Sequence, residues 1–261
     1  MKIGIDITPA IYRRGVSRYT VNLAKNLSKE KEISLSLFGS SLREKDYLKK
    51  VAAEILANPA NKAETAILSL PQQLLEKMLE FGISQVSKKL SNIDLFHSWD
   101  WMQPPDKNIP IVSTIHDLAI LKFPKTAHPK ILKSHQKSWD KLKKNKSHII
   151  AVSRTTKKDI MKYLGYPSYM VHVVHEALPE EFKSVSDSIT EEIALNIKNK
   201  LKLDKPYILF VGTREPRKNL AKLIEAWQPL SKDFELIIAG SEGWDQIEEK
   251  SKKFKSHPRF L

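Results

Sequence analysis

A glycine and two neighbouring basic residues in the last fifth of the chain have the chemistry of an anion site. Gly212 directly follows an apolar run, and Arg217 and Lys218 precede a segment with helical periodicity that extends to Trp227. Pro216 favours a helix that begins near Lys218. A loop that leads from a parallel strand into a helix offers free N–H groups to an anion, and two cations suit a diphosphate. The alternative is that both basic residues are solvated side chains of an ordinary loop.

Gly15 lies in a similar loop near the start of the chain, between an apolar run and a helical pattern. Without a Cβ atom, the backbone at this position could approach a phosphate closely. An ordinary tight turn explains the same glycine equally simply.

His116 and Asp117 follow another apolar run, residues 109–115. The carboxyl ends of parallel strands form the ligand-binding edge of an open α/β sheet, so their position favours a functional role. An imidazole there can bind a sugar hydroxyl or stabilise a developing charge, and Asp117 could orient the ring or start the next loop. The alternative is a histidine that satisfies loop backbone groups.

The other histidines give weaker signals. His97 ends the run 93–97 and occupies a comparable edge, but a lone histidine is more often structural. His172 and His175 are three residues apart in a predicted strand, and none of the histidines has metal-ligand spacing. We therefore expect no zinc site.

Alternating strands and helices must position these residues. Short runs rich in β-branched residues predict buried parallel strands over 2–7, 33–38, 93–97, 109–115, 148–152, 171–174, 207–211 and 234–239. A helix is predicted after the first strand, with Ser17 available as its cap. Two mainly helical stretches, 42–57 and 72–90, follow. The pattern predicts an α/β fold.

The length of 261 residues exceeds one typical domain and falls short of two. We expect an N-terminal Rossmann-like domain over 1–178, a connection over 179–204 with a helix near 188–202, and the first part of a second Rossmann-like domain over 205–261. Two strands do not complete such a domain.

The positive charge is concentrated in one segment. The chain carries 44 Lys and Arg against 30 Asp and Glu, a net charge of +14, and residues 122–158 hold twelve of the basic residues but only one acid, Asp140. Within this segment one face of a predicted helix carries Lys133, Lys137, Lys141 and Lys144, and the other carries Ile131, Leu132, His135, Trp139 and Leu142. One interpretation is a solvated lysine face over a packed helix. The other is a surface for an anionic membrane.

Composition excludes several classes of protein. Without cysteine there is no disulfide framework and no thiolate zinc site. The first residues lack the apolar segment of a signal peptide, and no run reaches the length of a membrane span, so we expect a cytoplasmic protein. No nucleic-acid motif accompanies the basic segment, which disfavours a nucleic-acid partner.

The segment 212–227 resembles the opening of the second domain of family 4 glycosyltransferases, enzymes with the GT-B fold of two facing Rossmann-like domains. Further matches run along the chain in order: Ile5-Asp6, Gly15-Val16-Ser17-Arg18-Tyr19, Phe96-His97-Ser98, Thr114-Ile115-His116-Asp117-Leu118, Ala151-Val152-Ser153 with Lys157-Lys158-Asp159, and Ile238-Ala239-Gly240 with Gly243-Trp244. Their common order and spacing make the resemblance much more specific than any single motif.

The resemblance implies transfer of a hexosyl group, mannose-like, from a UDP- or GDP-linked sugar to a glycan or lipid-linked acceptor, with retention and without an obligatory metal. It implies a role in cell-surface polysaccharide synthesis. Gly15, Gly212, Arg217 and Lys218 become ligands of the donor diphosphate, although Ser17 stands where relatives often have a second glycine. His116 becomes a contact of the transferred sugar, and His97, Asp117 and Ser153 become cleft residues. The lysine face then lies on the acceptor-binding domain, and the protein is expected to associate peripherally with the inner face of the membrane.

Three hypotheses remain open. In the family, the second domain continues with two glutamates eight residues apart that hold the donor, and Glu248-Glu249 cannot replace them. The first hypothesis is therefore a truncated sugar transferase. The second is a natural short protein that binds a nucleotide or glycan without turnover, and the third is a basic module that binds a membrane surface or nucleic acid.

Overall fold

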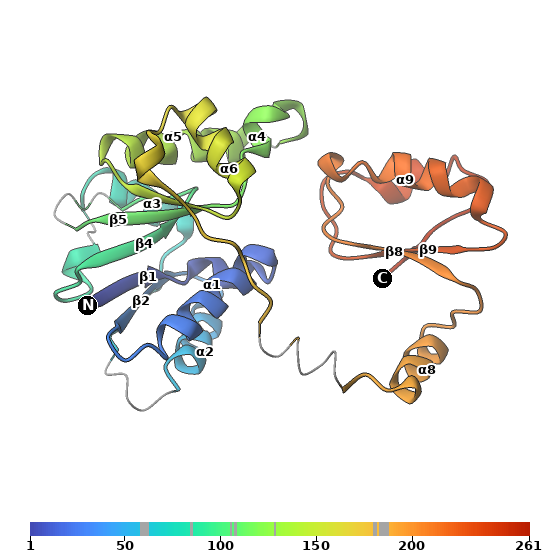
Figure 1. Cartoon of the computed structure of the whole chain (residues 1–261), viewed down its shortest axis with the longest axis horizontal. Helices are drawn as coiled ribbons and strands as arrows, with labels where there is room; N and C mark the ends of the chain where they lie inside the picture. Colours follow the sequence, from blue (N-terminus) through green and yellow to red (C-terminus); the bar gives the residue numbers. More distant parts are fainter. Residues whose placement is uncertain are drawn as a thin grey trace. The chain divides into compact units, whose positions relative to one another are not determined.

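The structure is a computed structural model that describes residues 1–57, 63–83, 86–104, 106, 109–127, 129–179, 182 and 188–261. The chain forms two compact units, each described by itself below (Figure 1). The first comprises Met1–Lys122 with His128–Ala177, and the second comprises Phe123–Ala127 with Leu178–Leu261. The division lies next to the boundary predicted at residue 178, and the predicted connection 179–204 includes residues outside the described ranges.

The first unit is built on a seven-stranded sheet with the order β3-β2-β1-β4-β5-β6-β7. Its strands are β1 Lys2–Asp6, β2 Ser34–Ser40, β3 Thr65–Leu68, β4 Leu95–Trp99, β5 Ile111–Ile115, β6 His148–Ala151 and β7 Val171–Val173. Every neighbouring pair is parallel. The strand order reverses between β1 and β4, so the carboxyl ends of these two strands flank the point where open α/β sheets bind ligands.

Helices cover both faces of this sheet. They are α1 Gly15–Leu27, α2 Lys45–Ile55, α3 Gln72–Glu80, α4 Ala119–Lys122, α5 Pro129–Lys144 and α6 Arg154–Asp159. Successive residues of β2 separate into two cores: Leu37 packs with Leu48 and Val51 of α2, whereas Phe38 packs with Leu75 of α3. Strands buried on both faces explain the continuous apolar runs in the sequence.

Two sequence predictions for this unit are wrong. The strand β3 was not predicted, because it is a four-residue edge strand without buried side chains and so lacks a buried apolar run. Ser17 is not the cap of α1. It lies inside the first turn, where its hydroxyl accepts a hydrogen bond from the Arg14 N–H at 3.1 Å and donates one to the Pro9 carbonyl at 2.6 Å.

The second unit has a parallel sheet of three strands in the order β10-β9-β8. The strands are β8 Tyr207–Val211, β9 Glu235–Ala239 and β10 Arg259–Phe260, and the helices are α8 Glu191–Lys200, α9 Leu220–Trp227 and α10 Ile247–Ser251. Two strands were predicted. The third was missed because only two of its residues pair with β9. Helices α9 and α10 pack on one face through Ile224, Trp227 and Ile247, while Val211 on the opposite face of β8 is 71% exposed. The α/β class is confirmed for both units.

Candidate functional site

The predicted site residues of the first unit gather at the carboxyl ends of β1, β4 and β5. His97 lies on β4, His116 directly follows β5, and Gly15 opens α1, the helix after β1. The ring of Tyr19 on α1 stands edge-on to His116 at 4.9 Å between centroids, and its hydroxyl lies 3.5 Å from Thr114 Oγ1. Helix α1 and strand β5 thus bring these residues to one sheet edge.

His97 is a buried residue of strand β4 at this edge of the sheet. Its Nε2 lies 2.8 Å from Thr114 Oγ1, and its ring is 4.9 Å from the indole of Trp99. Burial and, to a smaller extent, the electrostatic effect of His116 together lower the pKa of His97 to about 4. The ring is therefore neutral near pH 7 and packs among buried residues of β4 and β5, which favours the structural interpretation of this histidine.

His116 is held on one side and free on the other. Its Nδ1 lies 3.0 Å from Oε1 of Glu176, and Thr156 Oγ1 donates a hydrogen bond to its backbone carbonyl at 3.0 Å. Its Nε2 is buried and has no hydrogen-bond partner among the described residues. A buried nitrogen without a protein partner is available to a polar group of a ligand.

Asp117 and Ser153 have local structural roles. Asp117 Oδ1 accepts a hydrogen bond from the Ala119 N–H at 2.8 Å, so its carboxylate starts α4, the second of the two roles considered for it. Ser153 caps α6 by accepting a hydrogen bond from the Thr156 N–H at 3.0 Å. Through Thr156, this cap also braces the loop that carries His116.

Asp6, at the end of β1, is a buried carboxyl group to which we had assigned no role. Its Oδ1 accepts a hydrogen bond from the Thr8 N–H at 2.8 Å, yet burial raises its pKa to about 6. A group with such a shift at the ligand-binding edge of a sheet is a candidate for function. The signal in the sequence was an acidic residue at the end of an otherwise apolar strand.

Gly15 has no packing reason to be glycine. No heavy atom of the protein lies within 4 Å of the position that a Cβ atom would occupy there. Gly15 is the first residue of a 13-residue helix, whose N-terminal N–H groups favour anions. Open space beside a helix N-terminus is what close approach of a phosphate requires.

In the second unit, glycines hold the loop after β8 against the loop after β9. A Cβ atom on Gly240 would lie 2.7 Å from the carbonyl carbon of Gly212, and one on Gly243 would lie 2.7 Å from that of Arg214. Gly212 itself has a φ of 152°, a conformation that favours glycine. These contacts fix the backbone from which the predicted basic pair projects.

The basic pair lies just before α9, as predicted. Pro216–Lys218 form a 3-10 turn, and Asn219, with a φ of 53°, is the residue that precedes the helix. Lys218 is exposed, and Arg217 is 3.4 Å from Glu215. Arg214 lies nearby in the sequence and was not predicted as a site residue. It pairs with Glu248 and has a buried Nε without a partner in the described part of the chain.

The predicted site residues are thus divided between the two units. His97, His116, Asp117, Ser153 and Gly15 belong to the first unit, and Gly212, Arg217 and Lys218 belong to the second. Of the four residues expected to bind the diphosphate, Gly15 belongs to the first unit and the other three to the second.

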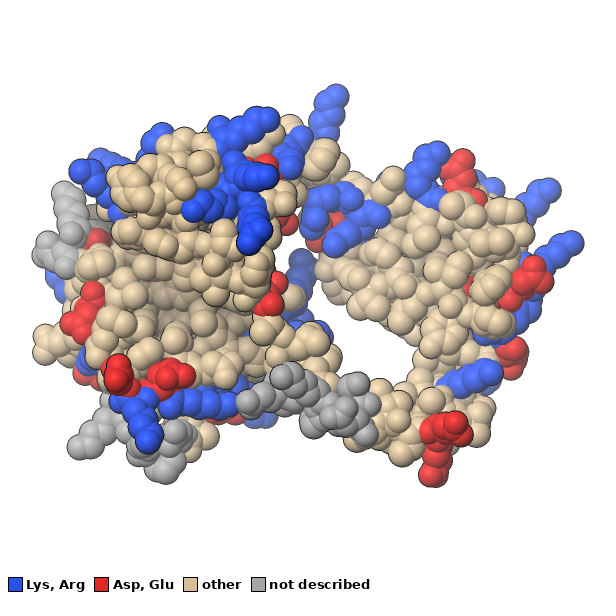
Figure 2. Space-filling model, in the orientation of Figure 1, with Lys and Arg blue, Asp and Glu red and all other residues tan. Residues whose placement is uncertain are grey.

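The lysine face lies on α5, where Lys and Arg gather on the surface of the first unit (Figure 2). Lys133, Lys137 and Lys144 are exposed and Lys141 is half-buried. Trp139 and Leu142 belong to the core, but Ile131, predicted on the buried face, is exposed. Ile131 lies in the first turn of the helix, before its packed part.

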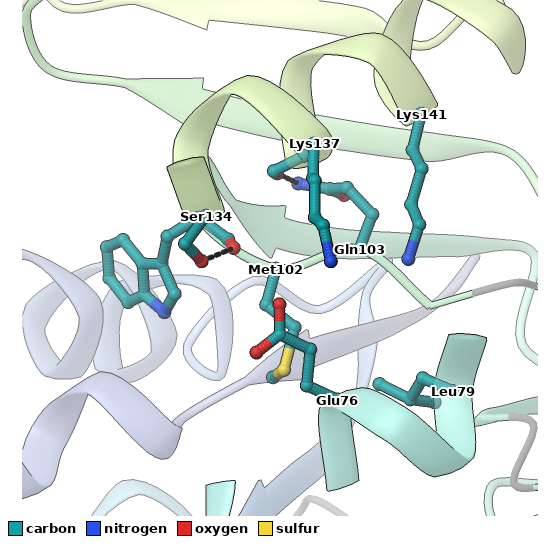
Figure 3. A pocket seen from close by; sticks show the side chains of 9 residues that line it. Glu76, Leu79, Met102, Gln103, Ser134, Lys137 and Lys141 are labelled. Carbon is teal, nitrogen blue, oxygen red and sulfur yellow. Dashed lines mark hydrogen bonds between the residues drawn. The ribbon is translucent and has the colours of Figure 1, made fainter. Parts of the chain in front are cut away.

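Lys137 and Lys141 also border a shallow hollow between α3 and α5 (Figure 3). Lys137 Nζ also pairs with Oε1 of Glu80, which does not line the hollow, at 3.2 Å. The hollow has a free volume of about 10 Å³, room for about one water molecule. It is therefore part of a surface and is too small to be a ligand cavity.

Comparison with known protein families gives two matches that together cover most of the chain. Residues 13–182 match the model for Glycosyltransferase Family 4, and residues 192–258 match that for Glycosyl transferases group 1. The chain is 26% identical over 94% of its length to O-antigen chain mannosyltransferase B of Escherichia coli. It spans 65% of the length of that curated relative.

Solved structures with the same fold support this similarity. Anabaena HepE, solved with UDP and glucose, has a TM-score of 0.67 at 13% identity, with 100% of this chain and 69% of that protein covered. A glycosyltransferase from Rickettsia africae has a TM-score of 0.58 at 18% identity, with 92% and 60% covered. A UDP-GlcNAc 2-epimerase from Neisseria meningitidis has a TM-score of 0.52 at 10% identity, with 100% and 72% covered. These likenesses confirm the predicted fold class and, at such identities, show the fold alone.

Proposed function

The chain belongs to glycosyltransferase family 4, and from this premise we propose that it transfers a hexosyl group, mannose-like, from a nucleotide diphosphate sugar to a glycan or lipid-linked acceptor with retention. The mannosyltransferase relative supports the choice of sugar, and the UDP bound in HepE supports a nucleotide donor. The proposed role is in cell-surface polysaccharide synthesis.

The observation that carries the proposal is the basic pair at the start of α9, on a loop locked by glycine contacts. Arg217 and Lys218, with the N–H groups at the start of α9, would stabilise the negative charge that develops on the leaving diphosphate. His116 would bind a hydroxyl of the transferred sugar through its free Nε2. The bond between the sugar and the phosphate breaks, a bond to the acceptor oxygen forms, and the departing phosphate takes the acceptor proton. These residues supply the positive charge without a metal.

The basic pair should be required for nucleotide binding. We expect the double variant Arg217→Ala with Lys218→Ala to lose the thermal stabilisation that UDP or GDP gives the wild-type chain, because the diphosphate loses both cations. The matched control is Lys198→Ala with Lys200→Ala, which removes the same charge from α8 of the same unit and should keep the stabilisation. Equal stabilisation of both double variants would reject the diphosphate assignment.

We also propose that the first unit docks on an anionic membrane surface through the lysine face, which would place it beside a lipid-linked acceptor. Phe81 and Ile83, which follow α3, are 77% and 64% exposed, and the preceding residue, Glu80, contacts Lys137 of that face. Exposed apolar side chains next to lysines suit the boundary between lipid head groups and acyl chains. No helix among the described residues is long and apolar enough to span a membrane.

Vesicle binding tests this surface. Replacing Lys133, Lys137, Lys141 and Lys144 with Gln should weaken binding to phosphatidylglycerol vesicles by up to about a thousandfold, because each basic residue near the membrane contributes about 1 kcal/mol. The loss should be largest at low salt. Replacing Lys29, Lys31, Lys49 and Lys50 instead is the matched control. If the two quadruple variants bind equally well in a sedimentation assay, the lysine face is not the docking surface.

A further inference from the structure

Glu176 is the described side chain that contacts the ring nitrogens of His116, at 3.0 Å from Nδ1. A carboxylate only accepts hydrogen bonds, so the contact requires a proton on Nδ1. In the neutral ring Nε2 then carries a lone pair, and this atom is buried without a partner in the described part of the chain. We infer that Glu176 is a positioning residue that makes Nε2 of His116 a hydrogen-bond acceptor for a hydroxyl of the bound sugar.

The other described neighbours of His116 do not determine which of its ring nitrogens carries the proton. The carboxylate of Asp117 is engaged with the Ala119 N–H. Tyr19 contacts the imidazole through the edge-on packing of its ring, and Thr156 holds the backbone carbonyl. These contacts orient the residue, but they do not determine which ring nitrogen carries the proton. That choice depends on the hydrogen bond to the other nitrogen.

Glu176 reaches His116 because the chain beyond β7 stays attached to β6. The Val174 N–H donates a hydrogen bond to the Ala151 carbonyl at 3.0 Å, and His175 Nδ1 lies 3.2 Å from the Val152 carbonyl. Glu176 follows immediately and is the second-to-last residue of this part of the first unit, which ends at Ala177. The proton position on His116 therefore depends on the conformation of residues 174–176, which follow β7.

This inference rests on the proposed function for the identity of the ligand, but the proton position can be tested alone. A ring that accepts a hydrogen bond from a hydroxyl discriminates against ligands that present only an acceptor there. Moving the proton to Nε2 would reverse that preference. Glu176 would thereby set the hydrogen-bonding polarity of the sugar site without touching the sugar.

Nitrogen NMR of histidine-labelled full-length chain measures the tautomer directly, and His116→Gln assigns the signals. The wild-type chain should show His116 with its proton on Nδ1. Glu176→Ala should shift the population toward the Nε2–H form, which the free side chain prefers in water. Glu176→Gln, whose amide oxygen accepts the same hydrogen bond, should restore the wild-type signals, and Asp117→Asn should leave them unchanged.

An unchanged His116 tautomer in Glu176→Ala would overturn the inference, as would a wild-type ring with its proton on Nε2. Both readouts are independent of turnover. If the wild-type chain neither binds a nucleotide nor transfers a sugar, the proposed function is contradicted. The NMR result would still decide the role of Glu176.

Discussion

Replacing Gly240 with alanine is expected to disrupt the second unit and to abolish nucleotide binding with it. The new Cβ atom would lie 2.7 Å from the carbonyl carbon of Gly212, and closer still to its oxygen. Backbone on both sides must then move. The φ of 142° at this position adds strain for any residue with a side chain. Together these effects should lower the free energy of unfolding by about 4 kcal/mol, which is at the upper end for a single substitution.

Hydrogen exchange measured by mass spectrometry would test this prediction for the second unit alone. Peptides that cover β8 and β9 should exchange much faster in Gly240→Ala, while those that cover β1 and β4 keep their protection. Gly15→Ala is the matched control, because its Cβ atom would meet no protein atom within 4 Å. This control should fold normally. Wild-type protection of β8 in Gly240→Ala would contradict the proposed locking of the two loops.

Replacing Asp6 with asparagine is expected to remove a pH-dependent loss of stability. The pKa of Asp6 is about 6 in the folded chain and about 3.8 in the unfolded chain. Below about pH 3 both states bind the proton. As the pH rises from 4 to 6, the unfolded state releases the proton first, so wild-type stability falls by about 3 kcal/mol, at 1.36 kcal/mol per pKa unit. Asparagine keeps the oxygen that accepts the Thr8 N–H and never ionises.

Urea unfolding of both proteins at several pH values between 4 and 7.5 measures this difference. The stability of Asp6→Asn relative to the wild type should increase by about 3 kcal/mol across that range and then stay constant. His97 titrates in the same range in the opposite sense, since burial lowers its pKa. Because it is present in both proteins, its contribution cancels in the comparison. Parallel stability curves for the two proteins would show that Asp6 is not a buried, protonated carboxyl group.

The strands at the centre of both sheets could be predicted because they are buried on both faces. Continuous runs such as 109–115 and 234–239 predicted β5 and β9 to within two residues. The edge strands β3 and β10 were missed because short, partly exposed pairing leaves no apolar run. Ser17 was misassigned as a cap because sequence alone did not show that α1 begins at Gly15.

The site residues show the same contrast. His116 was predicted from its place at a strand end, and the basic pair from its place before a helix. Which carboxylate acts on His116 was not predictable, because Asp117 is adjacent in sequence while Glu176 is 60 residues away. Asp6 and Arg214 were overlooked for a related reason: the raised pKa of Asp6 and the unpartnered Nε of Arg214 arise from burial, which is a tertiary property.

By itself, the sequence determined the α/β class, the family and the strand ends that carry the candidate site residues, because local periodicity and ordered motifs encode them. Only the tertiary structure decided the direction of hydrogen bonds within the site. Asp117 turned out to start a helix, Glu176 to hold the imidazole, and the glycines after β9 to lock the loop after β8. Each of these depends on contacts between atoms distant in the chain or on local geometry that residue order does not specify.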